Sequence, residues 1–276
     1  MENYGKTLRK IRQNLQITQV EISLGIMSQS NYSKMEKGEI DVPFAKMVEL
    51  LNRLGMTVNE FLFIHNNYTN PINRLKSLKP GDKKKMTENI KELKDLPHPT
   101  KREQELLFIF EAFLDVLNNN YEAASEKVIP VWNRLEKHNA WYLYDISLIN
   151  SILYLFPVDV AESIMTIALN RLEDFKSFRN IHQLSANFQI NFILILMENN
   201  QFEKALEYIE ELISFSQKQR LYMHLGVSYV RKGILLDVLN QQNSAKWYEK
   251  GFDILETAEN ETLVKELKKE IELYSI

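Results

Sequence analysis

Four consecutive polar residues, Ser28-Gln29-Ser30-Asn31, open a predicted helix that is followed by Gly38. Serine is a preferred N-cap residue and glycine commonly ends a helix in the left-handed conformation, so both ends of this helix are indicated by residue type. A glutamine amide donates and accepts at once, and it binds the N6 and N7 edge of adenine bidentately. Because the N-terminal part of such a helix enters the major groove of DNA, Gln29 is the best candidate for reading a base, with Ser28, Ser30 and Asn31 beside it.

Other polar side chains around this helix are candidates for contacting the DNA backbone. Gln19 opens the preceding predicted helix, where its amide and the helix N-terminus can both donate to a phosphate. N-terminal capping alone is the alternative role for Gln19. The spacing also makes Tyr32 and Lys34 candidates for the backbone or the groove edge, although a tyrosine at position 32 can equally belong to the core. The remaining candidates for phosphate contacts are the cations Arg9, Lys10 and Lys37.

Short helices separated by glycines must position these side chains. Leu8, Ile11 and Leu15 recur at helical spacing and predict one apolar stripe. Thr18 followed by Glu21 predicts a capping box at the start of the second helix.

The second and third helices are joined by a tight connection at Gly25, and two more helices start near Pro43 and Thr57. Five helices within residues 1–66, two of them joined by a short glycine turn, make the helix-turn-helix arrangement of a DNA-binding domain.

Taken together, Arg12, Gln19 and the segment from Ser28 to Gly38 resemble the repressor-type helix-turn-helix of lambdoid phage repressors and xenobiotic-response-element (XRE) regulators. The resemblance covers about residues 5–64 and includes the spacing, the caps and the glycine positions. It implies that Arg12 and Glu36 form the buried arginine–glutamate pair of that family, in which the arginine also faces a phosphate. Arg12 and Glu36 would then be a structural pair as well as part of the DNA interface.

Catalytic chemistry finds little support in the residues. The absence of cysteine excludes disulfides, thiolate zinc sites, iron–sulfur clusters and cysteine nucleophiles. The five histidines show no pair at metal-ligand spacing, and the chain has neither a glycine-rich phosphate loop nor a Gly-x-Ser-x-Gly motif. We therefore expect no enzyme, no cofactor and no metal site.

Composition and charge predict a helical protein of one or two domains in the cytoplasm. The 276 residues are 45% hydrophobic and 26% charged, and glycine and proline are few. Met1 to Gln19 is polar and cationic, unlike a signal peptide. The stretch from Ser147 to Leu169 is interrupted by Pro157 and two acidic residues, so we expect no membrane span. The net charge of −3 limits nucleic-acid binding to a local surface.

Residues 67–80 are rich in asparagine and are predicted to be a linker, and residues 81–276 are predicted to be helical repeats. We expect the Lys83-Lys84-Lys85 run to be a solvated helix face. Four segments share a polar loop, an alanine and an amphipathic helix, and a small residue there lets two helices of a hairpin approach closely. The alanines are Ala124, Ala161, Ala205 and Ala245.

A longer apolar helix precedes each of these segments. The predicted fold is therefore all-α, with a five-helix head followed by a right-handed α-solenoid of helical hairpins similar to tetratricopeptide (TPR) repeats. The predicted first helices are Glu103–Leu117, Trp141–Phe156, Ile181–Met197 and Leu221–Leu239.

A single repressor-type head joined to such repeats resembles the Rgg/GadR/MutR regulators of Gram-positive bacteria. The resemblance implies a homodimer that binds double-stranded DNA at a palindromic or pseudo-palindromic operator. It also implies that the repeats bind a short hydrophobic signalling peptide that is secreted and re-imported, as in quorum sensing. The last predicted helix, around Glu261 to Tyr274, is a candidate for the dimer contact.

Three asparagines inside otherwise apolar first helices are candidates for holding this peptide. Asn187 and Asn191 are four residues apart and share one helix face, and Asn150 lies on the helix before. Asparagine is a poor helix former and is costly to bury unpaired, so it either bonds a neighbouring helix or binds a ligand. The family's peptide sites also use asparagines on these helices. Candidates for side-chain pockets are Tyr144, Arg179, Tyr222 and Tyr229.

Two other functions remain open at this point. One is a DNA-binding regulator whose helical half only dimerises and receives no peptide. The other is a repeat protein that acts on protein partners, although such proteins lack an N-terminal helix-turn-helix.

Overall fold

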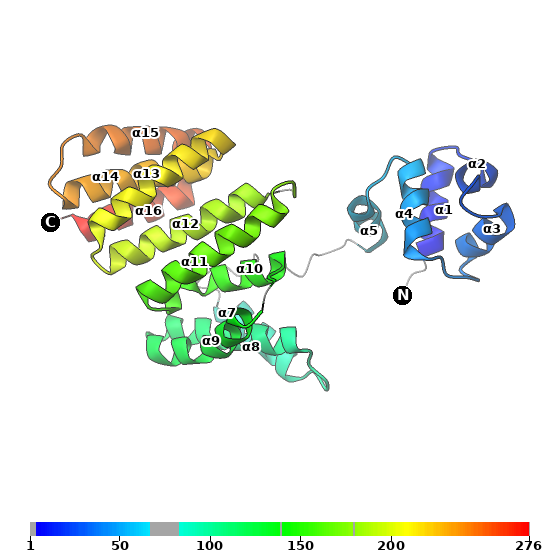
Figure 1. Cartoon of the computed structure of the whole chain (residues 1–276), viewed down its shortest axis with the longest axis horizontal. Coiled ribbons are helices and arrows are strands. Elements are labelled where there is room, and N and C mark those ends of the chain that lie inside the picture. The colour runs from blue at the N-terminus through cyan, green and yellow to red at the C-terminus, as the bar shows by residue number, and fades with distance from the viewer. Residues whose placement is uncertain (1–3, 67–82, 139, 179, 276) are drawn as a thin grey trace. The chain divides into compact units, whose positions relative to one another are not determined.

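The computed structural model describes residues 4–66, 83–138, 140–178 and 180–275. The chain forms two compact units, Met1–Asn73 (the head unit) and Arg74–Ile276 (the repeat unit). Every regular element within the described residues is a helix, which confirms the all-α prediction (Figure 1). The predicted linker at 67–80 lies entirely outside the described residues.

The head unit contains the five helices expected from the caps. Thr18 and Glu21 form both hydrogen bonds of a capping box, and the Ser28 hydroxyl accepts from the Asn31 N–H at 3.2 Å. Gly38 has a φ of 80° and ends the third helix in the left-handed conformation. The helices are α1 (Tyr4–Asn14), α2 (Gln19–Ser23), α3 (Gln29–Lys37), α4 (Phe44–Arg53) and α5 (Val58–Asn66).

The head core is built from Leu8, Ile22 and residues of α3 and α4, such as Leu50, that are fully buried. The predicted stripe of α1 is wrong at its last position, because Leu15 is 49% exposed. The helix ends at Asn14 and the backbone turns through Gln16 at a φ of 56°, so Leu15 no longer lies on the buried face.

The repeat unit is a stack of helices in which each packs mainly against its neighbours in the chain (Figure 1). Three of the predicted first helices are found as α8, α12 and α14, whereas the predicted helix Trp141–Phe156 is divided at Ile152 into α10 and the short 3-10 helix η1. The side chains of Lys83, Lys84 and Lys85 are exposed, as expected for a solvated face. The elements are α7 (Lys83–Lys94), α8 (Lys101–Leu117), α9 (Tyr121–Glu136), α10 (Leu143–Ser151), η1 (Leu153–Leu155), α11 (Val158–Leu172), η2 (Glu173–Phe175), α12 (Ile181–Glu198), α13 (Phe202–Gln219), α14 (Tyr222–Val238), α15 (Ser244–Thr257) and α16 (Glu261–Tyr274).

Small residues allow close helix packing, but not always where the alanine pattern placed them. Ala124, Ala161 and Ala205 are fully buried, whereas Ala245 is exposed and the prediction is wrong there. Glycines of α14 and α15 make the close approach instead. A Cβ added to Gly251 would lie 2.6 Å from Val230 Cγ2 and 2.8 Å from the Gly226 carbonyl oxygen.

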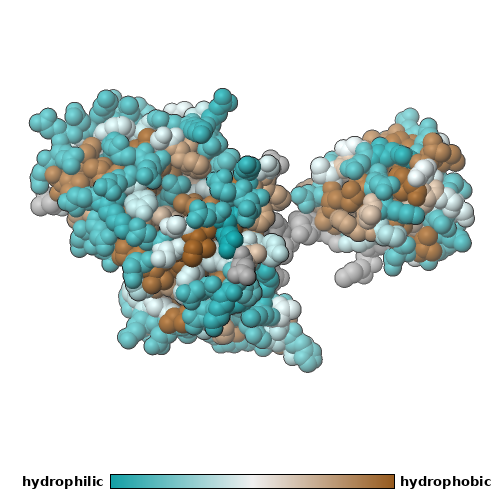
Figure 2. All heavy atoms as spheres, viewed as in Figure 1, coloured by the Kyte–Doolittle hydropathy of each residue, from teal (hydrophilic) through white to brown (hydrophobic). Residues whose placement is uncertain are grey.

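The outer surface carries hydrophobic side chains scattered among hydrophilic ones on the visible face of each unit (Figure 2). None of the helices in the described residues combines the length and the apolar character needed to cross a membrane.

Candidate functional site

A buried ion pair joins α1 to α3 in the head unit. Arg12 Nε donates to Glu36 Oε1 at 2.6 Å, and Arg12 Nη2 donates to Glu36 Oε2 at 3.0 Å. Arg12 Nη1 also donates to the Ile17 carbonyl oxygen at 2.7 Å, so the guanidinium ties the pair to the connection before α2. The arginine–glutamate pair expected from the repressor resemblance is therefore present, with bidentate geometry.

Both members of this pair carry their charge at neutral pH. The hydrogen bond to Glu36 raises the pKa of Arg12. Burial acts to raise the pKa of Glu36, but hydrogen bonds from Arg12 and Gln19 outweigh it and hold that pKa below its usual value.

Two glutamines extend the pair to the surface of α3. Gln19 Nε2 donates to Glu36 Oε2 at 2.7 Å, and Gln29 Nε2 donates to Gln19 Oε1 at 2.7 Å. An ionised carboxylate only accepts hydrogen bonds, so Gln19 must turn its NH2 group toward Glu36 and its oxygen toward Gln29. Gln29 is exposed and keeps its oxygen and its second N–H for a ligand. One acceptor beside one donor is the pattern that adenine requires.

The other predicted DNA-contacting residues fall into two groups. Tyr32 is fully buried, so it belongs to the head core and offers no surface to a duplex. The other predicted residues are exposed on the head and are Arg9, Lys10, Ser28, Ser30, Asn31, Lys34 and Lys37.

Arg53 supports this interface and was not singled out from the sequence. Its Nη1 donates to the carbonyl oxygens of Glu21 (3.3 Å), Ile22 (3.2 Å) and Leu24. It therefore satisfies the end of α2 from α4. Cations commonly interact with the C-terminus of their own helix. Arg53 lies on α4 and the carbonyl groups belong to α2 and the residue after it, so no spacing in the sequence predicts this contact.

In the repeat unit, two hydrogen bonds connect three successive first helices. Asn191 Nδ2 of α12 donates to Asn150 Oδ1 of α10 at 3.2 Å. His224 Nε2 of α14 lies 2.9 Å from Asn187 Oδ1 of α12, and the imidazole donates this hydrogen bond in the tautomer with a proton on Nε2. We call these four residues the polar row. The three predicted asparagines are thus brought together, and His224 was missed.

The predicted pocket residues outside the polar row are less uniform. Tyr144 has a buried hydroxyl that finds no hydrogen-bond partner within the described residues, and the Arg102 guanidinium lies 4.3 Å from its ring centroid. Tyr222 is 62% exposed. Tyr229 is only 7% exposed and its hydroxyl accepts from Gln217 at 2.9 Å, so it belongs to the core instead of an open pocket. Arg179 lies outside the described residues.

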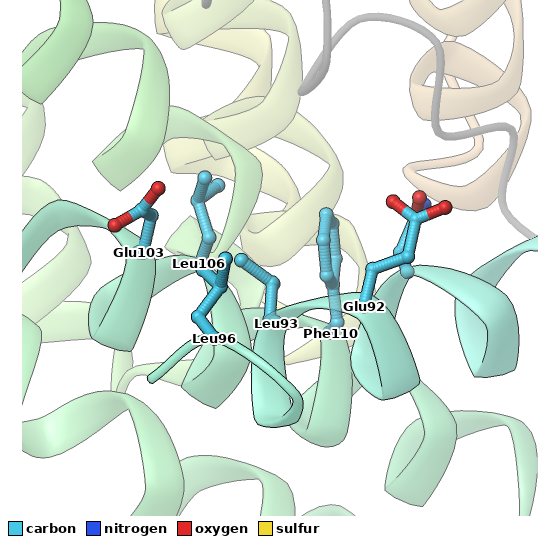
Figure 3. Close-up of a pocket in the computed structure, with 7 residues that line it drawn as sticks. Glu92, Leu93, Leu96, Glu103, Leu106 and Phe110 are labelled. Atoms are coloured by element: carbon cyan, nitrogen blue, oxygen red, sulfur yellow. The ribbon is translucent and has the colours of Figure 1, made fainter. Parts of the chain in front are cut away.

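A small cavity lies between α7 and α8 (Figure 3). None of the residues that line it belongs to the polar row. Its volume is about 170 Å³. Leu93, Leu106 and Phe110 line the middle, and the carboxylates of Glu92 and Glu103 lie toward its two ends (Figure 3). Pockets for drug-sized ligands span about 300–1,000 Å³, so this one is too small for a peptide. Among the described residues, no three His, Asp or Glu side chains group as a metal site.

The fold and the head site together define a DNA-binding regulator of the helix-turn-helix class. A helix-turn-helix family model matches residues 8–61. The C-terminal domain of the HTH-type transcriptional regulator Rgg matches residues 83–269, which is more than half of the chain. The chain therefore belongs to the Rgg family of transcriptional regulators, a family of DNA-binding proteins and not of enzymes.

Solved structures with low sequence identity share the fold over nearly the whole chain. A Listeria monocytogenes EGD-e protein assigned as a transcriptional regulator has a TM-score of 0.84 at 16% identity, covering 99% of this chain and 97% of its own. The SHP pheromone receptor Rgg2 of Streptococcus dysgalactiae has a TM-score of 0.78 at 18% identity, with coverages of 98% and 99%. Bacillus thuringiensis PlcR, in complex with the peptide PapR7 and DNA, has a TM-score of 0.68 at 18% identity, with coverages of 97% and 99%.

Proposed function

We propose that this regulator works in the cytoplasm as a homodimer that places two head units on a palindromic or pseudo-palindromic operator, and that a short hydrophobic signalling peptide bound along the polar row changes its affinity for that operator. Gln29 reads an adenine in the major groove. Arg9, Lys10, Lys34 and Lys37 contact phosphates, and Ser28, Ser30 and Asn31 border the groove.

The hydrogen-bond chain behind Gln29 supports the base-reading role. Its amide is held from behind through Gln19 to a buried charge pair, so little rotamer freedom is lost when it meets a base. Arg12 has three of its nitrogens bonded within the protein, which makes it a positioning residue for Gln19 and Gln29.

The single observation that carries the peptide part is the polar row. After its internal bonds are made, Asn150 keeps an NH2 group, Asn191 keeps an oxygen, and Asn187 keeps an NH2 group. These groups match the carbonyls and the N–H along one edge of an extended peptide, whose backbone must be hydrogen-bonded to enter a water-poor surface. Buried apolar residues such as Leu148, Phe188 and Phe192 hold the helices that carry the row.

The solved neighbours add support from their own ligands. The Streptococcus dysgalactiae protein is a pheromone receptor, and the Bacillus thuringiensis structure contains both a peptide and DNA. These neighbours support the proposal that one chain of this fold binds both a peptide and an operator.

Fluorescence anisotropy tests the proposal with the full-length protein. The DNA probe is a labelled duplex selected from a random pool by the wild type, and the peptide probes are an array of synthetic apolar octapeptides. We expect at least one octapeptide to shift the operator affinity, and by linkage the duplex to shift the affinity for that octapeptide by the same factor.

Asn150→Ala and Asn187→Ala are the matched variants, and Asn170→Ala, at an exposed position of α11 outside the row, is the control. We expect each of the two row variants to bind the octapeptide about tenfold more weakly, because one hydrogen bond is lost at each site. If no octapeptide shifts the operator affinity of the wild type, the repeats serve dimerisation alone.

A further inference from the structure

We propose that His224 is a positioning residue for the peptide site: it holds the side-chain amide of Asn187 with its NH2 group facing the peptide. This inference rests on the proposed function, and it assigns a role to a residue that does not itself need to touch the peptide. Its basis is the hydrogen bond between α14 and α12 and the way in which both helices are held.

A ring nitrogen that carries a proton only donates, whereas a side-chain amide has a donor end and an acceptor end. The protonated nitrogen therefore decides which end of the amide faces it. With a proton on Nε2, His224 can bond only to an acceptor, so Asn187 must turn Oδ1 toward it, as the 2.9 Å contact shows. Both N–H groups of Asn187 then face away from His224. The opposite rotation of the amide would bring two donors together and present an oxygen to the peptide carbonyl.

The other bond of the polar row has no such preference. Asn150 and Asn191 are both amides, so both can rotate together and remain bonded with donor and acceptor exchanged. The Asn187 amide differs when its partner is protonated at Nε2, because that imidazole bonds to the oxygen of the amide and not to its nitrogen. In that tautomer, the selectivity of the row for a peptide carbonyl at this point depends on the imidazole.

The backbone around His224 is held in place from α12 and α16. One turn along α14, Ser228 Oγ donates to the His224 carbonyl oxygen at 2.7 Å. Two turns along, Arg231 donates from Nη1 to the Ile190 carbonyl oxygen of α12 at 3.0 Å, and it forms a bidentate pair with Glu270 of α16. Ile190 lies between Asn187 and Asn191, so this bond fixes the register of α14 against the asparagines.

Burial of the imidazole also keeps it in the required state. Desolvation lowers the pKa of His224, so the ring is neutral at pH 7 and carries a single proton. In the proposed arrangement this proton lies on Nε2, the nitrogen that is 2.9 Å from Asn187 Oδ1.

Three variants test the role with the octapeptide that binds the wild type best. His224→Phe keeps a ring but removes the donor, and we expect it to weaken binding about tenfold, as Asn187→Ala does. His224→Gln offers an N–H donor near the position of Nε2 but, as an amide, also an acceptor, so we expect an affinity between that of His224→Phe and that of the wild type. In the Asn187→Ala background, His224→Phe should cause no further loss, because its effect passes through Asn187.

Unchanged thermal unfolding and unchanged operator affinity without peptide show that each variant is folded. Wild-type affinity in His224→Phe overturns the proposal while the peptide function stands. A further loss in the Asn187→Ala background also overturns it, because His224 then acts on the peptide or the fold directly.

Nitrogen NMR of the peptide-free protein separates the two proposals. We expect the His224 ring to be protonated at Nε2, with a shift that changes in Asn187→Ala. A proton on Nδ1 contradicts the positioning role whatever the peptide result. If the Nε2 signal is as expected but no octapeptide binds the wild type, the proposed function has failed, and the role in peptide binding falls with it.

Discussion

The head unit and the repeat unit each present a side-chain amide that is held from behind, but by different chemistry. Gln29 of the head is held through Gln19 by a carboxylate, which is itself paired with a buried guanidinium. Asn187 of the repeats is held by a neutral imidazole at a partly buried surface. A paired carboxylate cannot become a donor at neutral pH, whereas an imidazole can change tautomer. The donor and acceptor pattern of Gln29 is thus fixed at neutral pH, whereas that of Asn187 depends on the tautomer of His224.

The two arrangements also differ in how far apart in the chain their partners lie. Gln19 and Gln29 are ten residues apart, whereas the bonds of the polar row link residues 41 and 37 apart. The head arrangement is therefore part of one compact motif. The polar row exists only when three helical hairpins are stacked in the correct register.

Breaking the charge pair should have the largest effect and should be confined to the head. We expect Arg12→Ala to destabilise the head unit by about 3–5 kcal/mol, because it leaves Glu36 buried without its partner. Thermal unfolding followed by circular dichroism should show an early transition of the head and an unchanged transition of the repeats. Arg9→Ala removes the same charge from an exposed position of α1 and is the control. Equal head stability in both variants would contradict the role given to the pair.

A methyl group added between α14 and α15 should affect the repeats and leave the head unchanged. We expect Gly251→Ala to cost about 1–3 kcal/mol through overpacking, because the new Cβ meets Val230 and the backbone at Gly226. Urea unfolding measures the loss, with Glu249→Ala on the exposed side of α15 as the control. A repeat unit as stable as the wild type would show that the two helices separate freely there.

Lowering the pH should reduce the stability of the head unit through Glu36, an effect smaller than those of the two substitutions. The pKa of Glu36 is lower in the folded head than the value of about 4.3 in an unfolded chain. The carboxylate therefore stabilises the head fully above about pH 4.3, and this contribution is lost as the pH falls through the lower, folded pKa. The midpoint temperature of head unfolding should therefore decrease in the wild type as the pH is lowered below about 4.3. The contribution of this carboxylate to the pH dependence should be absent from Glu36→Gln.

Local features of the chain were predictable from residue types alone. Thr18 with Glu21, Ser28 and Gly38 act within one helical turn, so the order of the residues determines the caps and hence the helix ends. The alternation of helices in the repeats followed from the spacing of polar loops, alanines and apolar helices.

Features that depend on packing between distant helices were not predictable in this way. Gly226 and Gly251 replace the expected alanine contact, and the burial of Tyr32 and Tyr229 depends on which neighbour faces each ring. The role of His224 had one usable signal, because it follows Asn187 by 37 residues, close to the spacing of the repeats. That signal requires the register of the hairpins to be known first.

The affinity of Gln29→Ala for the selected duplex and for its single-base-pair variants tests the central claim most directly, with Gln13→Ala on α1 as the control. We expect Gln29→Ala to lose about 1–3 kcal/mol on the selected duplex and to lose discrimination at one A·T position only, while binding to unrelated duplexes is unchanged. Wild-type affinity and wild-type discrimination at every position would contradict the assignment of Gln29 as the base reader at the end of the Arg12–Glu36–Gln19 chain.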